Sequence, residues 1–273
     1  MSQDAVGNGR SQLQITVRSL RKEDKVAVQD VFREGMMSVA PEASRAMLRA
    51  KVQQILSVST AVAAVAALIH RQCARTRIRS SGVASTSFLL AVFAQVVHFR
   101  FLIESKVADH AERMLQGDMA DPWSHYMFDP LKHFWVAMLT DANGTEEVVG
   151  CVGLDVATRK SENKQEASVQ ENKDKAKAAL ANAGGDVQKI GELRRMAVLK
   201  KTRRAGIASK LYAEFEKKAR EIQLDGIYLE TSSMQPAACA MYTKLGYKFL
   251  TEMPIPVYPW KYFASVRYYQ KTF

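Results

Sequence analysis

Residues 191–208, GELRRMAVLKKTRRAGIA, decide the fold of this chain. The first half alternates apolar and charged residues enough to predict a strand, and the second half is a tight basic turn that opens into a helix. That helix carries apolar residues at mostly four-residue spacing: Ile207, Leu211, Phe215, Ala219 and Ile222. We therefore expect a strand, a turn and a helix N-terminus in direct succession.

This turn is suited to an anion, above all a phosphate. The unpaired N–H groups of a helix N-terminus point at one place, and the helix dipole adds positive potential there. Gly206 lets the backbone approach a ligand with no Cβ in the way. The turn lacks the Lys-Ser/Thr pair of a nucleoside-triphosphate loop and the three spaced glycines of a dinucleotide fold, so both classes are excluded.

The pattern Arg203-x-x-Gly206-x-Ala208 resembles the signature of the GCN5-related N-acetyltransferases (GNAT family), in which this loop holds the pyrophosphate of acetyl-CoA. The resemblance runs continuously over residues 189–250. ELxxMAV at 192–198 resembles the family's fourth strand, GIYLET at 226–231 a buried strand, and AMYxxLGY at 240–247 the helix and turn that follow it. The resemblance implies an α/β (α+β) fold with a mixed central sheet flanked by helices, and acetyl-CoA as co-substrate.

The same resemblance supplies the candidate site residues. The pyrophosphate would be bound mainly by N–H groups of Arg203, Arg204, Ala205, Gly206, Ile207 and Ala208. Strand residues Met196, Ala197 and Val198 would meet the pantetheine arm, and N–H groups near Val198 would hold the oxyanion. No metal or redox cofactor is expected.

Acetyl transfer also needs a neutral amine and a proton for the departing thiolate. Glu192 is the candidate base, acting directly or through a water; its alternative role is a strand carboxylate paired with Arg194. Tyr242 lies four residues before Gly246 and is the candidate partner of the CoA sulfur. Its alternative role is a core tyrosine.

Composition narrows the partners. The chain has 273 residues, 47% hydrophobic content and a formal net charge of +11, which favours anionic partners such as CoA phosphates, an anionic membrane or nucleic acid. Nucleic acid is not expected, because the basic residues are spread along the chain and no recognition module is visible. Three cysteines without metal spacing support neither a disulfide framework nor a zinc site.

Two segments, 52–69 and 80–99, carry no charge except possibly His98, and a basic loop separates them. Each approaches the ~20 residues that a membrane helix needs. We expect a membrane-associated helical hairpin over 52–103, inserted in the acetyltransferase domain. Two alternatives remain open: two buried helices of a soluble bundle, and a hairpin lying shallow in one leaflet.

The hairpin, together with DMxD at 118–121, FWVA at 134–137 and VVGxVG at 148–153, resembles the membrane-anchored GNAT branch that contains cysteine S-conjugate and aspartate N-acetyltransferases. That resemblance implies an intracellular membrane, the endoplasmic reticulum, with the catalytic domain facing the cytosol. The acceptor would be a primary amine of a small molecule, of the amino acid or cysteine S-conjugate type, that attacks directly in a ternary complex. The alternatives are a protein lysine acetyltransferase and a non-catalytic, membrane-tethered CoA-binding protein.

The rest of the chain completes one domain over residues 12–273 after a flexible polar tail at 1–11. Strands are expected at 14–18, 134–139, 148–154 and 263–269, with a helix from Glu23 through Met36. Residues 159–188 are charged, Ala-rich and almost free of large apolar side chains. They predict a solvated, disordered loop between two paired strands.

Overall fold

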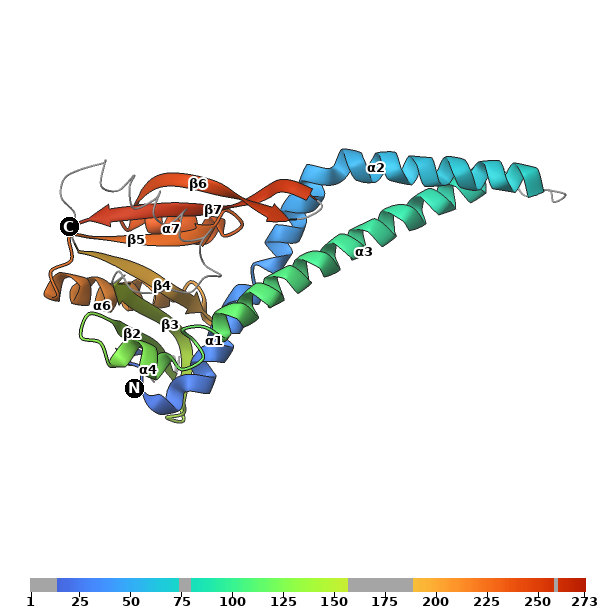
Figure 1. The fold of residues 1–273 in the computed structure, drawn as a ribbon. Coiled ribbons are helices and arrows are strands. Elements are labelled where there is room, and N and C mark those ends of the chain that lie inside the picture. Colours follow the sequence, from blue (N-terminus) through green and yellow to red (C-terminus); the bar gives the residue numbers. More distant parts are fainter. Residues whose placement is uncertain (1–13, 74–79, 157–188, 258–259) are drawn as a thin grey trace, which may run out of the picture.

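The computed structural model describes residues 14–73, 80–156, 189–257 and 260–273 (Figure 1). The tail expected at 1–11 and the loop expected at 159–188 lie outside these residues.

A seven-stranded mixed sheet forms the centre of the domain (Figure 1). Its spatial order is β1-β2-β3-β4-β5-β7-β6, and every neighbouring pair is antiparallel except β4 and β5, which are parallel. The strands are β1 Gln14–Ser19, β2 His133–Thr140, β3 Glu146–Val156, β4 Ile190–Val198, β5 Gly226–Ser232, β6 Lys248–Val257 and β7 Trp260–Thr272. The expected mixed sheet is confirmed.

The parallel pair β4–β5 is incomplete. Residues Ile190 to Leu193 pair with Gly226 to Leu229, and the pairing then stops although β4 continues to Val198 and β5 to Ser232. Figure 1 shows the two strands diverging beyond this point. On its β5 side, the last part of β4 therefore has no strand partner within the described residues, so its N–H groups on that side are not used in a β-ladder.

Helices cover both faces of the sheet. On one face lie α1 (Lys25–Met37), which follows a 3₁₀ turn at Lys22–Asp24, and α4 (Pro122–Met127). On the other face lie α6 (Ile207–Glu221), whose first residue packs close to Gly150 of β3, and α7 (Pro236–Lys244), whose Tyr242 packs near Tyr269 of β7. Four of the five residues of the predicted apolar stripe of α6 are buried, Ile207, Leu211, Phe215 and Ala219, whereas Ile222 is half-buried and follows directly after the helix.

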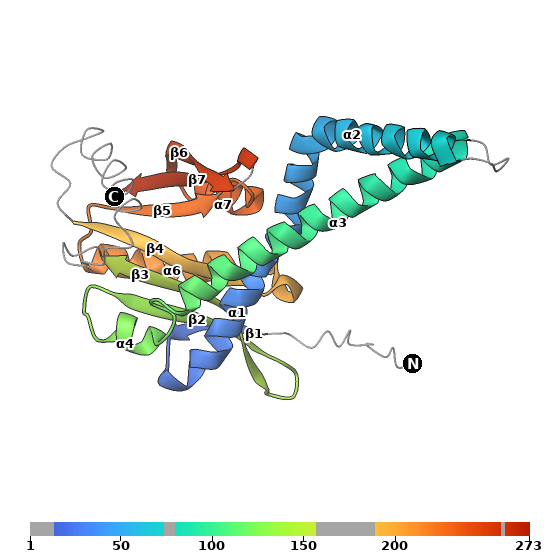
Figure 2. The same cartoon turned by 45° about the vertical axis from the view of Figure 1, so that its right-hand side comes forward.

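Two long antiparallel helices, α2 (Ala40–Cys73) and α3 (Ser80–Leu115), project away from the sheet (Figures 1 and 2). We call this pair the helical arm. Its helices are longer than the hairpin expected at 52–103, because their ends nearest the domain continue as packed stems. Met47, Phe99 and Ile103 are buried together in these stems, and further out Gln95 donates a hydrogen bond of 2.9 Å to the buried Ser59.

Strand β6 was not predicted, because Pro254 and Pro256 make its sequence read as an irregular connection. A proline has no N–H to give to a ladder, and in a sheet it is tolerated on an edge strand or at a bulge. Both conditions hold here. β6 is the last strand of the sheet, and its register with β7 shifts between these two prolines.

Candidate active site

The turn after β4 has the expected geometry. A 3₁₀ turn at Lys200–Thr202 is followed by Gly206, which is the N-cap of α6 with φ of 76°. No side chain caps this helix end. The N–H groups of the first turn of α6 are therefore left for an outside acceptor. Positive φ favours glycine, although Arg204, two residues earlier, also lies in this region with φ of 69°.

These residues line a cavity of about 210 Å³. Its wall consists of Val198, Thr202, Arg203, Arg204, Gly206, Ile207, Ala208 and Ser209. Six of the nine residues predicted to bind the cofactor are thus brought together, and Ala205, Met196 and Ala197 are not part of this wall. The side chain of Ala197 packs against Gly35 of α1, so only its backbone can serve a ligand.

Two of the four basic side chains of the turn, Arg203 and Lys201, have structural partners. Arg203 donates from Nε to the carbonyl of Val198 at 3.1 Å and from Nη2 to Oγ of Ser38 at 2.7 Å. Lys201 pairs with Glu147 at 2.7 Å. Binding of a pyrophosphate here would therefore depend mainly on backbone N–H groups, with the exposed Arg204 adding long-range attraction.

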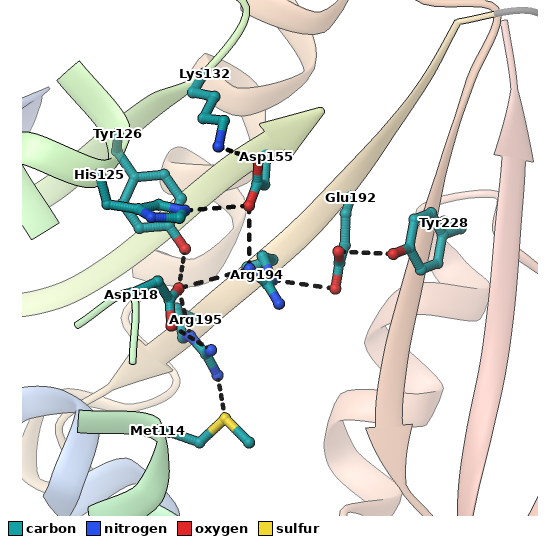
Figure 3. A network of polar contacts seen from close by, with 10 residues as sticks. All are labelled: Met114, Asp118, His125, Tyr126, Lys132, Asp155, Glu192, Arg194, Arg195 and Tyr228. Carbon is teal, nitrogen blue, oxygen red and sulfur yellow. Dashed lines mark hydrogen bonds and ion pairs between the residues drawn. The ribbon is translucent and has the colours of Figure 1, made fainter. Parts of the chain in front are cut away.

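Glu192 lies on β4 just before the two strands diverge (Figure 3). Tyr228 of β5, its partner in the ladder, donates its hydroxyl to Oε2 at 2.6 Å, and Arg194 Nε contacts Oε1 at 3.1 Å. Burial, and then the adjacent carboxylate, raise the pKa of Tyr228 well above its usual value, so this hydroxyl stays protonated and donates. The structure thus shows the expected pairing with Arg194. Two of about four lone-pair sites of the carboxylate are occupied.

A β-bulge follows directly. Gly153 of β3 pairs with Arg194 and Cys151 pairs with Ala197, so Arg195 and Met196 stand opposite a single residue. Arg195 has φ of 55°. The bulge places two consecutive arginines on one face of the sheet, where both meet Asp118 (Figure 3).

The arginines belong to a buried polar network (Figure 3). Arg195 makes a two-pronged contact with Asp118, with Nε at 2.9 Å from Oδ2, and Arg194 contacts Asp155 at 3.0 Å. Asp118 also accepts the hydroxyl of Tyr126. Burial alone would raise the pKa of Asp118, but the hydrogen bonds and charge of Arg195 outweigh it and lower that pKa.

Asp155 is the second carboxylate of this network and contacts three side chains, those of Arg194, His125 and Lys132. His125 Nε2 lies 3.2 Å from Oδ2 and Lys132 Nζ lies 3.0 Å from Oδ1. Burial opposes ionisation, yet the bond to His125 and the charges of Arg194 and Lys132 hold the pKa of Asp155 well below its usual value. The network thus contains three carboxyl groups and three Lys or Arg side chains, and it can be buried because their formal charges balance.

Tyr242 is buried on α7, and Gly246 follows the helix with φ of 87°, in the left-handed region in which many helices end. Its ring packs near those of Tyr247, at 5.9 Å between centroids, and Tyr269, at 6.4 Å. Burial raises the pKa of Tyr242 well above its usual value, and nearby Cys239 adds to the effect. As an acid it is therefore weaker than a free tyrosine.

Sequence reasoning missed the roles of several residues in this network. Asp118 lies in the quoted DMxD motif and Tyr228 in the quoted GIYLET strand, but neither position showed a chemical partner. Those partners are 77 and 36 residues away in the chain. Only the register between β4 and β5 and the position at which α3 returns to the sheet bring them together.

A mixed sheet that opens between two parallel strands, with a helix N-terminus beginning at a glycine beside the opening, is suited to a ligand that carries a phosphate. The sequence model of the acetyltransferase (GNAT) family matches residues 101–247, more than half of the chain. The protein belongs to the GNAT acetyltransferase family and is an N-acetyltransferase.

Solved structures with a similar fold include an acetyltransferase of the GNAT family from Staphylococcus aureus, at 14% identity and a TM-score of 0.43, covering 95% of this chain and 99% of that one. Arabidopsis thaliana NAA60 in complex with a bisubstrate analogue is similar at 12% identity and a TM-score of 0.46, covering 95% of this chain and 99% of that one. An acetyltransferase from Streptococcus agalactiae is similar at 19% identity and a TM-score of 0.38, covering 59% of this chain and 78% of that one. No curated protein sequence matches the chain.

Two stretches of the arm are long and apolar enough to cross a membrane, Lys51–Gln72 and Ser85–Leu115. Only 17% and 11% of their most apolar windows are buried. The alternative of two helices buried in a soluble bundle is therefore not what the structure shows. Large apolar side chains stand exposed along the arm, among them Val65, Leu89, Leu90, Phe93 and Phe101.

Proposed function

We propose that this acetyltransferase moves the acetyl group of acetyl-CoA to the primary amine of a small molecule, of the amino acid or cysteine S-conjugate type, by direct attack in a ternary complex. One observation carries the donor assignment: the uncapped N-terminus of α6 opens on a cavity at the end of β4. A pyrophosphate there accepts N–H groups from Arg204 to Ala208, because the N–H of Arg203 already donates to the carbonyl of Lys200 at 3.4 Å. The pantetheine arm follows the unpaired edge of β4 from Val198 back to Met196.

In this proposal, Glu192 deprotonates the incoming amine. Its carboxylate is fixed by Tyr228 and Arg194, and it keeps lone pairs for the amine or for a bridging water. It lies at the last ladder pairs before the two strands diverge, beside the strand edge that would carry the thioester. The tetrahedral oxyanion is stabilised by N–H groups of β4 near Val198.

Tyr242 stabilises the departing thiolate of CoA by donating a hydrogen bond to its sulfur, without full proton transfer. A thiol has a pKa of about 8.5 and a free tyrosine about 10, so proton transfer from tyrosine to thiolate is uphill even before burial. The raised pKa of Tyr242 increases that gap. A hydrogen bond from a neutral hydroxyl still stabilises the developing negative charge.

We predict that Tyr242→Phe lowers turnover about tenfold and leaves acetyl-CoA affinity within about twofold, because one hydrogen bond made in the transition state is worth about 1.4 kcal/mol. Steady-state kinetics and calorimetry with acetyl-CoA measure the two effects. Tyr269→Phe, in the neighbouring ring, is the matched control and should change neither. Equal turnover of Tyr242→Phe and wild type would reduce Tyr242 to a packing residue.

The acceptor class is tested by thiol release from acetyl-CoA in detergent-solubilised protein. The panel contains free amino acids, cysteine S-conjugates, polyamines and lysine peptides. Turnover with amino acids or S-conjugates supports the proposal, and turnover confined to lysine peptides replaces it with protein acetylation. Acetyl-CoA binding without turnover across the panel would contradict the proposed small-molecule acceptor and favour a CoA-binding scaffold.

We further propose that the helical arm inserts in the membrane of the endoplasmic reticulum, with the catalytic domain in the cytosol where acetyl-CoA is supplied. Support comes from the exposure of its apolar side chains over both spans. In water these side chains would form a long exposed apolar surface, of the kind that marks an interaction site rather than a solvated face. Inside the arm, the hydrogen bond from Gln95 to Ser59 satisfies two polar groups that lipid could not.

We predict that the full chain floats with lipid vesicles in a density gradient, and that Leu90→Lys with Phe93→Lys abolishes flotation. Each lysine near the centre of a membrane helix opposes insertion by about 3 kcal/mol. Phe128→Lys is the matched control, because Phe128 is 74% exposed but lies outside the arm. A wild-type chain that stays monodisperse in the dense fraction without detergent would rule out the membrane assignment.

A further inference from the structure

Arg195 holds a backbone conformation that few side chains adopt. Its φ of 55° lies in the left-handed region, inside a strand, at the bulge of β4. Such conformations persist only where the surroundings fix them. The bulge lies between Glu192 and Val198, on the edge of β4 where it diverges from β5. The contacts that hold Arg195 in this conformation therefore also set the position of that strand edge.

The side chain of Arg195 contacts two segments far away in the chain, residues 114–118 and helix α1. Asp118 takes its guanidinium in a two-pronged ion pair, Met114 Sδ accepts from Nη1 at 2.8 Å, and the ring of Phe32 lies 5.5 Å from the guanidinium carbon. The carbonyl of Arg195 is held as well, since the buried thiol of Cys151 donates to it at 3.2 Å. Bulge and anchors thus form one buried unit.

The cofactor turn is held separately. Arg203 ties the end of β4 to Ser38, and the residues that line the cavity at the α6 N-terminus include none of the network around Asp118. We therefore expect loss of the bulge anchor to leave the phosphate site intact while the strand edge before Val198 shifts. Affinity for CoA and rate of acetyl transfer should respond differently.

We propose that Arg195 and Asp118 are a positioning pair: their ion pair holds the β4 bulge so that the N–H groups preceding Val198 meet the thioester carbonyl of bound acetyl-CoA. Neither residue touches the reacting atoms. This inference rests on the proposed path of the donor along β4. Arginine suits the task because its planar fork fixes both the distance and the direction of Asp118.

The test separates positioning from simple stabilisation. Asp118→Asn alone strands the charge of Arg195 in the interior, which is expected to destabilise the fold. The double variant Asp118→Asn, Arg195→Met removes both charges, keeps an oxygen for the hydroxyl of Tyr126 and fills the space with an apolar chain, so thermal stability should return. Asp121→Asn is the matched control, because Asp121 caps α4 in the same segment and asparagine caps equally well.

We expect the melting temperature of the double variant to return close to that of the wild type. Its acetyl-CoA affinity stays within about threefold, while kcat falls by at least about 30-fold, which corresponds to about 2 kcal/mol. Recovery of kcat together with stability would overturn the proposal, because the pair would then be a structural support only.

A second readout does not need turnover. Burial raises the pKa of the Cys151 thiol to about 12 and should keep it unreactive. If the bulge loosens in the double variant, alkylation of Cys151, followed by mass spectrometry of the native protein, becomes at least about tenfold faster than in wild type or Asp121→Asn. An alkylation rate of Cys151 unchanged from wild type would refute the anchoring role. This readout needs no amine acceptor, so it tests the anchor even if the proposed function fails.

Discussion

Gly206→Glu is expected to weaken acetyl-CoA binding by at least about 100-fold. The substitution places a carboxylate at the N-cap of α6, on the wall of the cavity proposed for the pyrophosphate. Two unit charges about 5 Å apart repel by about 3 kcal/mol at the effective dielectric constant of about 20 that suits protein surfaces. Calorimetry with acetyl-CoA measures the loss, and circular dichroism shows whether the variant is folded.

Gly206→Ala is the control for backbone strain. A Cβ at this position meets nothing within 4 Å, so the added methyl costs only the strain of φ at 76°. The neighbouring Arg204 shows that this turn accepts a non-glycine residue in the same region. We expect Gly206→Ala to bind acetyl-CoA within about fivefold of wild type. Unchanged affinity in folded Gly206→Glu would refute the assignment of the turn.

Glu192→Gln is expected to lower turnover by about 100- to 1000-fold at neutral pH. A positioned general base contributes about 10² to 10⁴ in rate, and the amide that replaces it cannot take a proton. The measurement is kcat/KM for the acceptor at neutral pH with a saturating donor.

Tyr228→Phe is the control for Glu192, because it removes the hydroxyl contact of 2.6 Å and keeps the carboxylate and its partner Arg194. Its loss of turnover should be no more than about tenfold. A folded Glu192→Gln enzyme with the full rate would show that Glu192 only pairs with Arg194. The base would then have to be found elsewhere.

The local structure around the turn could be predicted because each signal is short-range. The alternation in β4, the spacing of Ile207, Leu211 and Phe215, and the glycine before the helix act over a few residues, and the structure confirms them. Of the two side chains that contact Glu192, the sequence predicted only one. Arg194 is two residues away and was expected as a partner, whereas Tyr228 depends on the register of a parallel pair.

The buried network shows why the remainder escaped prediction. Two adjacent arginines in an alternating strand should point to opposite faces, and only the bulge turns both toward Asp118. A bulge has no reliable sequence mark when its left-handed residue is arginine rather than glycine. Likewise, Pro254 and Pro256 argued against β6, and their tolerance depends on its place at the edge of the sheet.

The arm is rooted in the domain twice. α2 begins two residues after Ser38, which Arg203 holds, and α3 ends three residues before Asp118, which Arg195 holds. A domain on one flexible tether tumbles freely, whereas two fixed attachments remove most of its rotation. With the arm in a bilayer, the site between β4 and β5 would stay at a fixed distance from the lipid surface and in a fixed orientation to it. Such an enzyme would search for acceptors in two dimensions and would favour amines that gather at that surface.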